Sequence, residues 1–403
     1  MEVRAGYKQT ELGVIPKDWS VKPLLSVIHV VTGQVDPRRE PYKSMILVAP
    51  DHIESASGHL NSKQTAVEQH AISGKFQFKS GDIVYSKIRP YLRKAFLADF
   101  EGICSADMYP LTPASNVSAR FMLAILLGHD FSTFAEAVSV RSGFPKINRT
   151  ELAEYRFALP PPAEQRAIAT ALSDADVLIT SLGNLIAKKR NIKQAAMQEL
   201  LTGKRRLPGF NGDWELKRLG DLISDIADGG TPSTSRTEHF GGCINWIVIE
   251  DINDEIFSTE QTLTEEGLSH SSARIWPPGS IILSTGATIG EVGITKVHSA
   301  TKQGICGIIV NQSADSIFLK YWFKQNKPLL LAKAQGSSIK EVRPPTLVKL
   351  ELNVPVIDEQ RAIATVLSDM DAELTAMEQK RDKTKAIKQG MMQELLTGRI
   401  RLV

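Results

Sequence analysis

The chain has few of the residues that cross-link small folds or give a protein a strong overall charge. Its 403 residues include only three cysteines, which form neither a CxxC pair nor a disulfide framework, and aromatic residues make up 6%. The formal net charge is +3, from 48 basic and 45 acidic residues, so any basic surface must be local. These shortages exclude a disulfide scaffold and give no bulk electrostatic sign of a nucleic-acid binder.

Long apolar runs and enzyme motifs are also missing. The longest clearly apolar run, 121–127, is too short to cross a bilayer, and the N-terminal residues lack the apolar core of a secretory signal. The sequence has no GxxxxGK[ST] loop, no GxGxxG after a strand, no GxSxG elbow and no metal-binding histidine spacing. We therefore expect a cytoplasmic protein with no catalytic residues, no metal site and no cofactor of its own.

What the sequence has instead is an internal repeat. The segment EQRAIAT begins at Glu164 and again at Glu359, an offset of 195 residues. The same offset relates the two QELLTG segments, which end at Gly203 and Gly398. A long repeat that is present only twice differs from a solenoid and indicates a fused pseudo-dimer. Each half consists of a globular region followed by a long helix, and such a protein suits a ligand with two related halves.

The pattern predicts an α+β fold with two globular mixed α/β regions. Short β-type runs broken by Gly, Pro, Asn and Asp fill residues 1–155 and 208–350. A buried helix is expected at 121–127 in the first region, and a helix is expected at 318–323 in the second. The two regions are separated by two long helical segments, at 156–207 and 351–403.

Each long helix is expected to span about 38 residues, or roughly 57 Å. Proline at 160–162 can open the first helix, since Pro is tolerated at the first helical position, and Asp358 is the expected N-cap of the second. Gly203 and Gly398 suit the left-handed position that follows a helix end.

Apolar residues in both helical segments recur in alternating steps of four and three, the pattern of a coiled-coil seam. Because a pseudo-two-fold axis relates the halves, we expect the helices to pair with each other as an antiparallel coiled coil. The alternative is two separate helices that each bind another protein. The predicted pairing residues are Ile168, Leu172, Ile179, Leu182 and Ile186 in the first helix, and Ile363, Leu367, Met370, Leu374 and Met377 in the second.

Basic and hydroxyl-rich loops mark the places where the globular regions would meet an anion. Residues 87–94 put four cations and a tyrosine into eight positions directly after a predicted strand, and 141–149 form a second basic stretch. Arg and Lys neutralise phosphates, while Arg, Asn, Gln, Ser and Thr can also read base edges. Solvated surface charge is the alternative interpretation. The predicted DNA-contacting residues are Lys87, Arg89, Tyr91, Arg93, Lys94, Arg141, Lys146 and Asn148 in the first region, and Thr285, Thr288, Lys296, Lys302, Gln303, Ser338 and Lys340 in the second.

The helical motifs resemble those of the specificity subunit of type I restriction-modification systems. The resemblance rests on the proline-preceded EQRAIA helix starts, on the MQELLTG helix ends, and on the PGFNGDW run at 208–214. In that family each globular part is a target recognition domain, and each domain reads one half of a bipartite, gapped DNA sequence. The resemblance covers essentially the whole chain.

The resemblance implies a non-catalytic DNA-recognition subunit and names its partners. The paired helices would set the spacing between the target recognition domains and dock methyltransferase subunits, of which two are expected, that use S-adenosylmethionine. Restriction subunits, which use ATP and Mg²⁺, would join them on double-stranded DNA, with no membrane involved. Because the two regions differ in sequence, we expect an asymmetric target. The alternatives are the specificity subunit of another fused restriction system and a coiled-coil scaffold with two protein-binding heads that does not bind DNA.

Overall fold

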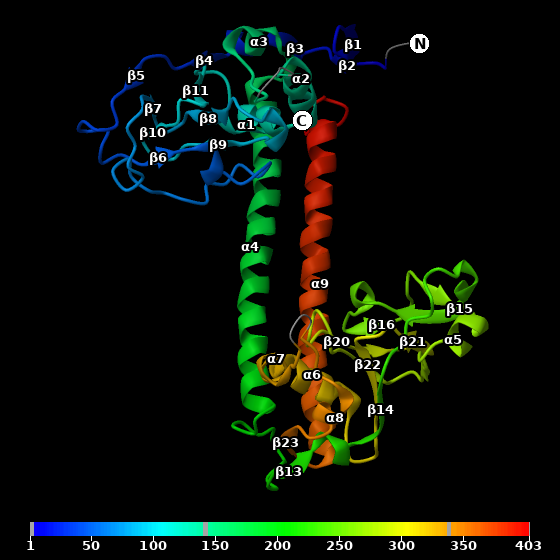
Figure 1. The fold of residues 1–403 in the computed structure, drawn as a ribbon. Coiled ribbons are helices and arrows are strands. Elements are labelled where there is room, and N and C mark those ends of the chain that lie inside the picture. Colours follow the sequence, from blue (N-terminus) through cyan, green and yellow to red (C-terminus); the bar gives the residue numbers. More distant parts are fainter. Residues whose placement is uncertain (1–3, 140–143, 337–339, 403) are drawn as a thin grey trace. The chain divides into compact units, whose positions relative to one another are not determined.

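The computed structural model describes residues 4–139, 144–336 and 340–402 (Figure 1). The chain forms two compact units whose boundaries fall inside the two long helices. Unit 1 comprises residues 1–183 and 379–403, and unit 2 comprises residues 184–378. Unit 1 therefore combines the first globular region, called here the first head, with the C-terminal end of the chain. Unit 2 contains the second head.

The first head is built on two four-stranded sheets, with strand orders β4-β11-β8-β9 and β5-β7-β10-β6. Ile83 and Tyr85 of β8 enter the main core, whereas Val84 between them enters a second core. This alternation is that of a strand buried on both faces. The strands of the unit are β1 (Tyr7–Thr10), β2 (Gly13–Pro16), β3 (Ser20–Pro23), β4 (Ile28–Val30), β5 (Gln34–Val35), β6 (Leu47–Val48), β7 (Lys75–Phe78), β8 (Ile83–Ser86), β9 (Ala95–Leu97), β10 (Gly102–Cys104), β11 (Met108–Pro113) and β12 (Arg156–Leu159).

The helices of the first head pack on the main core. The Ser118 hydroxyl caps α1 by accepting a hydrogen bond from the Phe121 N–H, and α1 then buries Phe121, Met122 and Leu126. The helix expected at 121–127 is thus confirmed. The helices are α1 (Ala119–Leu127), α2 (His129–Ser139), α3 (Arg149–Glu154) and α4 (Pro162–Leu200), with 3₁₀ turns η1 (Leu24–Ser26), η2 (Pro50–His52) and η3 (Pro90–Leu92).

The second head repeats this plan with its own strand orders, β14-β22-β19-β20-β16 and β17-β15-β21-β18. In β19, Ile281 and Leu283 enter the main core and Ile282 enters another, so β19 is the counterpart of β8. The strands are β13 (Glu215–Arg218), β14 (Ile223–Asp228), β15 (Phe240–Ile247), β16 (Glu255–Ile256), β17 (Thr262–Leu263), β18 (Ile275–Trp276), β19 (Ile281–Ser284), β20 (Val292–Thr295), β21 (Ser299–Thr301), β22 (Ile305–Val310) and β23 (Glu351–Val354).

The main helix of the second head is α6, which confirms the helix expected at 318–323. The Asp315 carboxylate caps α6, and Phe318, Tyr321 and Phe323 are fully buried in the core. The helices are α5 (Glu265–Ser269), α6 (Ser316–Gln325), α7 (Lys327–Lys333), α8 (Pro344–Leu347) and α9 (Ile357–Leu395), with 3₁₀ turns η4 (Leu219–Asp221), η5 (Thr237–His239) and η6 (Ile249–Asp251).

A two-stranded sheet leads into each long helix: β3 pairs with β12 before α4, and β13 pairs with β23 before α9. Pro162 opens α4, as expected. The prediction of Asp358 as the N-cap of α9 is wrong, because the helix begins one residue earlier, at Ile357. The chain turns at Val356, whose carbonyl accepts hydrogen bonds from the Glu359 and Gln360 N–H groups, so Asp358 lies in the first turn.

The helix ends also agree with the sequence. Gly203 and Gly398 have φ of +69° and +71°, the left-handed conformation expected after a helix. Within the described part of the chain, no single helix is long and apolar enough to span a bilayer. Only α1 and α2, bent by 57° at their junction, meet the length and composition criteria, and they do so as a pair.

Candidate nucleic-acid interface

The two basic stretches of the first head form one surface. The Arg89 N–H donates a hydrogen bond to the Pro145 carbonyl at 2.8 Å, and the Ile147 N–H donates to the Lys87 carbonyl at 2.9 Å. These bonds join the loop after β8 to the segment that leads into α3. We call residues 87–94 and 144–149 the first loop cluster. The sequence placed both stretches near an anion but did not show that they touch.

The loop after β8 has an uncommon backbone. Arg89 and Arg93 flank η3, and both are left-handed, with φ of +49° and +46°. A residue with a side chain rarely adopts this conformation, which costs of order 1 kcal/mol or more and concentrates at functional sites. The fold of the first head therefore holds this loop in one backbone conformation, at a cost in conformational energy.

Aromatic rings hold the cations of the first loop cluster. The Lys87 ammonium lies 5.3 Å from the centroid of the Tyr109 ring, and the Arg149 guanidinium lies 5.7 Å from the same ring. The Arg89 guanidinium lies 5.5 Å from the Phe144 ring, whose side chain is 72% exposed. Cation–π contacts fix a charged group without neutralising it. The first loop cluster thus offers ordered positive charge.

Other predicted contacts of the first head have structural partners. The Lys94 ammonium donates to the Pro50 carbonyl at 2.7 Å. The Asn148 side chain accepts from the Glu151 N–H at 2.9 Å as the N-cap of α3. Both side chains therefore stabilise the loops instead of pointing freely outward.

The remaining predicted residues of the first head differ in exposure. Tyr91 and Lys146 are exposed, and Lys146 bridges to Ile88 between the two stretches. Arg93 is half-buried, and its guanidinium lies 3.5 Å from the Leu127 carbonyl. Arg141 lies outside the described residues.

The second head has a corresponding cluster. The N–H groups of Thr285 and Gly286 donate to the Gly304 carbonyl at 2.9 and 3.1 Å, and the Val342 N–H donates to the Thr285 carbonyl at 2.9 Å. These bonds join the turn after β19 to 302–304 and to the segment before α8. We call residues 285–290, 302–304 and 335–336 with 340–342 the second loop cluster. It occupies the same place after β19 that the first loop cluster occupies after β8.

The side chains of the second loop cluster are less basic. The Lys302 ammonium lies 5.8 Å from the Trp246 ring, and Thr288, Gln303 and Lys340 are exposed. Thr285 is buried and contributes its backbone. Ser338 lies outside the described residues.

An acid also lies at the second loop cluster. The Asp228 carboxylate accepts a hydrogen bond from the Gly304 N–H at 3.1 Å, and burial raises the pKa of this carboxyl group. The second head therefore combines few cations with one partly buried acid.

Lys296 is not brought to the second loop cluster. It follows β20, at the end of the β19–β20 hairpin opposite the 285–291 turn, and pairs with Glu255 at 2.7 Å. The hairpin thus separates Lys296 from the other predicted contacts of the second head.

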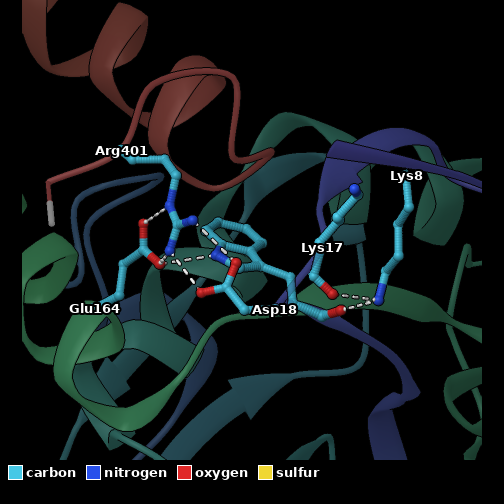
Figure 2. Close-up of polar contacts among 6 residues, drawn as sticks. Lys8, Lys17, Asp18, Glu164 and Arg401 are labelled. Atoms are coloured by element: carbon cyan, nitrogen blue, oxygen red, sulfur yellow. Dashed lines mark hydrogen bonds and ion pairs between the residues drawn. The ribbon is translucent and has the colours of Figure 1, made fainter. Parts of the chain in front are cut away.

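Within unit 1, ion pairs join the C-terminal segment of the chain to the first head (Figure 2). The sequence analysis missed this contact. Arg401 binds Glu164, with N–O distances of 3.0 and 2.7 Å, and also Asp18, at 2.9 and 2.7 Å. The Trp19 indole N–H also donates to Glu164, at 2.8 Å, through the Oε2 oxygen that Arg401 binds. The Glu164 side chain is 1% exposed, so this charge is buried and fully paired. The hydrogen bond from Arg401 holds the pKa of the Asp18 carboxyl below its usual value.

Unit 2 has the same contact one repeat earlier. Arg206 stands 195 residues before Arg401 and binds Glu359 with two N–O distances of 2.6 Å. We call the two contacts the Arg401 clasp and the Arg206 clasp. Trp214, the counterpart of Trp19, is half-buried, and its buried indole N–H has no hydrogen-bond partner among the described residues. The repeat supplied the signal for both clasps, because both arginines follow a Thr-Gly helix end.

The two long helices lie side by side and antiparallel in each unit (Figure 1). In unit 1, Lys388 of α9 pairs with Asp176 of α4 at 2.5 Å. In unit 2, Lys193 of α4 pairs with Asp371 of α9, which is the same pair one repeat apart. Knobs-into-holes packing of a coiled coil stays a prediction.

The predicted pairing residues face inward to different degrees. Of the ten, those buried are Ile168, Leu172, Leu182, Ile186, Ile363, Leu367 and Leu374, and those half-buried are Ile179, Met370 and Met377. Ile168 and Leu172 pack in one core with Leu395, and Ile363 and Leu367 pack in another with Leu200. The end of each helix thus completes the core at the start of the other.

Comparisons with known proteins agree with this architecture. A family model described as "Type I restriction modification DNA specificity domain" matches residues 16–190 and 211–387. The EcoDI type I restriction enzyme specificity subunit of Escherichia coli is 34% identical over 222 residues, which span 54% of this chain and 48% of that protein. The MjaVIII specificity subunit of Methanocaldococcus jannaschii is 24% identical over 96% of this chain and 94% of its own length.

A solved structure has the same fold. Its TM-score is 0.64 at 21% identity, and the match covers 96% of this chain and 99% of that one. That structure comes from work on complex assembly and conformational transition of the type I restriction-modification system. The resemblance seen in the helical motifs is therefore confirmed. Two copies of the family domain fill most of the sequence, and the chain belongs to the type I restriction-modification DNA specificity family, whose general role is non-catalytic recognition of a DNA target.

Proposed function

We propose that each head reads one half of an asymmetric, bipartite, gapped DNA target, with the first and second loop clusters as the reading surfaces. The two long helices set the spacing of the half-sites and dock two methyltransferase subunits. Those partners bind S-adenosylmethionine, and restriction subunits that use ATP and Mg²⁺ complete the complex on the duplex. The chain itself supplies specificity.

The observation that carries this proposal is the correspondence of the two loop clusters. In the first head the Ile147 N–H binds the Lys87 carbonyl, and in the second head the Val342 N–H binds the Thr285 carbonyl, at 2.9 Å in both cases. The same backbone frame therefore presents different side chains. Equivalent frames with different side chains suit two related but unequal half-sites, because side chains read base edges and the frame sets position.

The two loop clusters differ in positive charge, which indicates that the two heads contribute differently to DNA binding. The first loop cluster holds six cations, and three of them, Lys87, Arg89 and Arg149, lie within cation–π distance of a ring. Cations at phosphates dominate affinity and its salt dependence. The second loop cluster has two lysines, Lys302 and Lys340, beside the Asp228 carboxylate and is therefore poorer in positive charge. We therefore expect the first head to contribute more phosphate contacts, and the second to depend more on Thr288 and Gln303.

The deciding experiment is a methylome. The chain is co-expressed with the methyltransferase subunit of its own system, and methylated adenines are mapped by single-molecule sequencing. We expect one bipartite, asymmetric motif that disappears when this chain is omitted. A palindromic motif contradicts the asymmetric target. No new methylation from a complex that assembles with a competent methyltransferase contradicts the proposal as a whole and favours a scaffold without DNA recognition.

Two lysines of the second head provide a matched pair of variants. Lys302→Ala removes an exposed cation of the second loop cluster, whereas Lys296→Ala removes a cation at the other end of the β19–β20 hairpin. We expect Lys302→Ala to weaken duplex binding by the assembled complex and to reduce the salt slope by about one, as for one lost phosphate contact. Lys296→Ala should leave both unchanged. Equal effects of the two variants would refute the assignment of the second loop cluster.

Exposed apolar residues on the helices support the docking of partner subunits. Ile192 of α4 and Ile387 of α9 are repeat counterparts, and they are 44% and 52% exposed. Large apolar residues that recur at matched exposed positions are typical of an interaction surface. We propose that one methyltransferase subunit docks on the helix surface around Ile192 and a second docks on the surface around Ile387.

Co-purification tests this docking. With Ile192→Asp or Ile387→Asp alone, the complex should retain one methyltransferase subunit, and with both changes it should retain none. Leu12→Asp, at an exposed leucine outside the long helices, is the control. Two retained methyltransferase subunits in the double variant would rule out this docking surface.

A further inference from the structure

A histidine of the second head is buried without a partner. His239, the last residue of η5, is 2% exposed, and neither ring nitrogen has a hydrogen-bond partner among the described residues. A buried polar group that lacks a partner costs about 1–3 kcal/mol. Folded proteins rarely leave such a group unsatisfied, and a bound ion is one way to satisfy it.

Two further potential metal ligands, a carboxylate and a second imidazole, lie near the His239 ring. Glu266 and His270 belong to α5 and its C-cap, and one potential ligand atom of each lies within 4.8 Å of the others and of a His239 nitrogen. Residues four apart lie on the same face of a helix, which is why Glu266 and His270 reach the same point. Within the described part of the chain, no other three His, Cys, Asp or Glu side chains meet in this way.

The geometry of the two imidazoles suits one shared ion. Their ring centroids are 5.7 Å apart. Two imidazoles bound to a zinc ion through nitrogen at about 2.05 Å have centroids about 5.2 Å apart at a tetrahedral angle and about 6.4 Å apart when opposite. The observed separation lies between these values, so the distance between the two rings is compatible with a shared ion.

A hydrogen bond can orient the His270 ring for binding through Nε2. The His270 Nδ1 lies 2.9 Å from the Glu266 backbone carbonyl and 3.2 Å from the Ser269 hydroxyl. In the tautomer in which Nδ1 donates to the carbonyl, Nε2 is the lone-pair nitrogen. Histidine ligands of metals commonly donate their other N–H to a backbone carbonyl in this way, which fixes the tautomer and the ring orientation.

Backbone contacts between η5 and the start of α5 hold the three residues near one another. The Thr264 N–H donates to the His239 carbonyl at 3.0 Å, and the Thr264 hydroxyl donates to the Glu238 carbonyl at 2.9 Å. A Cβ atom at Gly267 would lie 2.2 Å from the His239 carbonyl oxygen, so α5 and η5 touch through their backbones. Glycine at this position therefore keeps Glu266 and His270 close to His239.

We propose that His239, Glu266 and His270 bind a divalent transition-metal ion, with zinc as the best match, and that the ion links η5 to α5 in the second head. Two imidazole nitrogens and a carboxylate oxygen are ligands that suit zinc, whereas magnesium and calcium prefer all-oxygen sets. The exposure of Glu266 and His270 leaves the fourth position open to water. This site goes beyond the DNA-reading function, and it departs from the sequence expectation of no metal.

Zinc titration of the full-length chain tests the site. The protein is stripped with EDTA, dialysed and titrated with ZnCl₂ by calorimetry, with bound metal counted by plasma mass spectrometry. We expect one zinc ion per chain at micromolar or tighter affinity and a higher melting temperature with zinc, but none with MgCl₂. Binding that needs millimolar zinc would overturn the proposal.

Matched variants separate this site from unspecific binding. His270→Ala removes an exposed ligand and is expected to fold, and it should weaken zinc binding by roughly 100-fold or more, since loss of an outer-shell partner alone typically costs 10–100-fold. His298→Ala, at another exposed histidine of the same head, should bind zinc as the unaltered chain does. Equal zinc binding by the two variants would refute the site. X-ray absorption on the zinc-loaded chain should show two imidazole nitrogens, and a shell of oxygens only would also overturn the proposal.

Discussion

The Arg401 clasp makes the first head depend on the last residues of the chain. Arg401→Met removes the charge and keeps an unbranched apolar stem, which leaves the buried Glu164 carboxylate with the Trp19 indole as its remaining hydrogen-bond donor. Removing one partner of a buried ion pair costs about 3–5 kcal/mol. The Arg401 side chain is 26% exposed and Asp18 is 48% exposed, so solvent screens part of the interaction. We therefore expect a loss of about 2–3 kcal/mol in the free energy of unfolding.

Calorimetry and hydrogen exchange measure this loss. For a unit of about 200 residues, 1 kcal/mol corresponds to a shift of about 2–4 °C, so the melting temperature should fall by about 4–12 °C. Exchange should increase at β3 and at the start of α4, both of which belong to unit 1. Arg399→Met, which removes an exposed arginine near the same end, is the control.

A double-mutant cycle identifies the cause. If the loss comes from an unpaired buried carboxylate, Glu164→Gln in the Arg401→Met background should recover part of the stability, because it removes the uncompensated charge. Equal stability of the Arg401→Met and Arg399→Met chains would refute the reasoning. A loss that Glu164→Gln does not reduce would show that the arginine acts through packing alone.

The clasp also has a predicted pH dependence. The folded-state pKa of Asp18 is lowered, first by the hydrogen bond from Arg401, below the value of about 3.9 expected for the unfolded chain. Its contribution is therefore present above that unfolded value and is lost as the pH falls through the lower folded value. The stability difference between the unaltered chain and Arg401→Met should shrink below about pH 4. A difference that stays constant between pH 7 and pH 3 would contradict this.

Further predictions follow from the repeat. Trp19→Phe should destabilise the chain more than Trp214→Phe, because the Trp19 indole donates a hydrogen bond to Glu164 at 2.8 Å, whereas the Trp214 indole has no partner among the described residues. Thermal melting compares the two variants, and equal losses in melting temperature would contradict this reasoning. Gly390→Ala should raise stability by up to about 1 kcal/mol, because this helical glycine has open space around its Cβ position, and chemical denaturation measures the gain. Insertion of four residues near Ala187 and near Arg381 should lengthen the gap of the methylated motif while both half-sites stay unchanged, and altered half-site bases would count against the helices as a spacer.

The sequence predicted the long helices well because their signals are local and repeated. The EQRAIAT and QELLTG segments set the helix ends at matching places, and the apolar pattern identified Ile168 and Ile363, which are fully buried. Asp358 was assigned to the N-cap because its residue type suits a cap, but the turn at Val356 starts the helix earlier. Residue preference alone does not fix a helix start within one residue.

Side-chain roles in the loops were harder to predict, because they depend on contacts between distant segments. Lys94 was chosen for its charge, yet it binds the Pro50 carbonyl, and Asn148 caps α3. The clasps could have been found, since Arg206 and Arg401 are one repeat apart. His239 and His270 have no motif spacing, and only the packing of η5 on α5 brings them together.

The Arg401 clasp has a consequence for genetics and protein engineering. Residues 379–403 belong to the same unit as residues 1–183, and Arg401 binds Asp18 and Glu164 of that unit. A C-terminal truncation, frameshift or affinity tag near residue 400 should therefore damage the N-terminal head and spare the C-terminal one. The same arrangement allows a rearranged gene, opened between the helix end at Gly203 and Trp214 and joined at its old termini, to encode the same set of contacts.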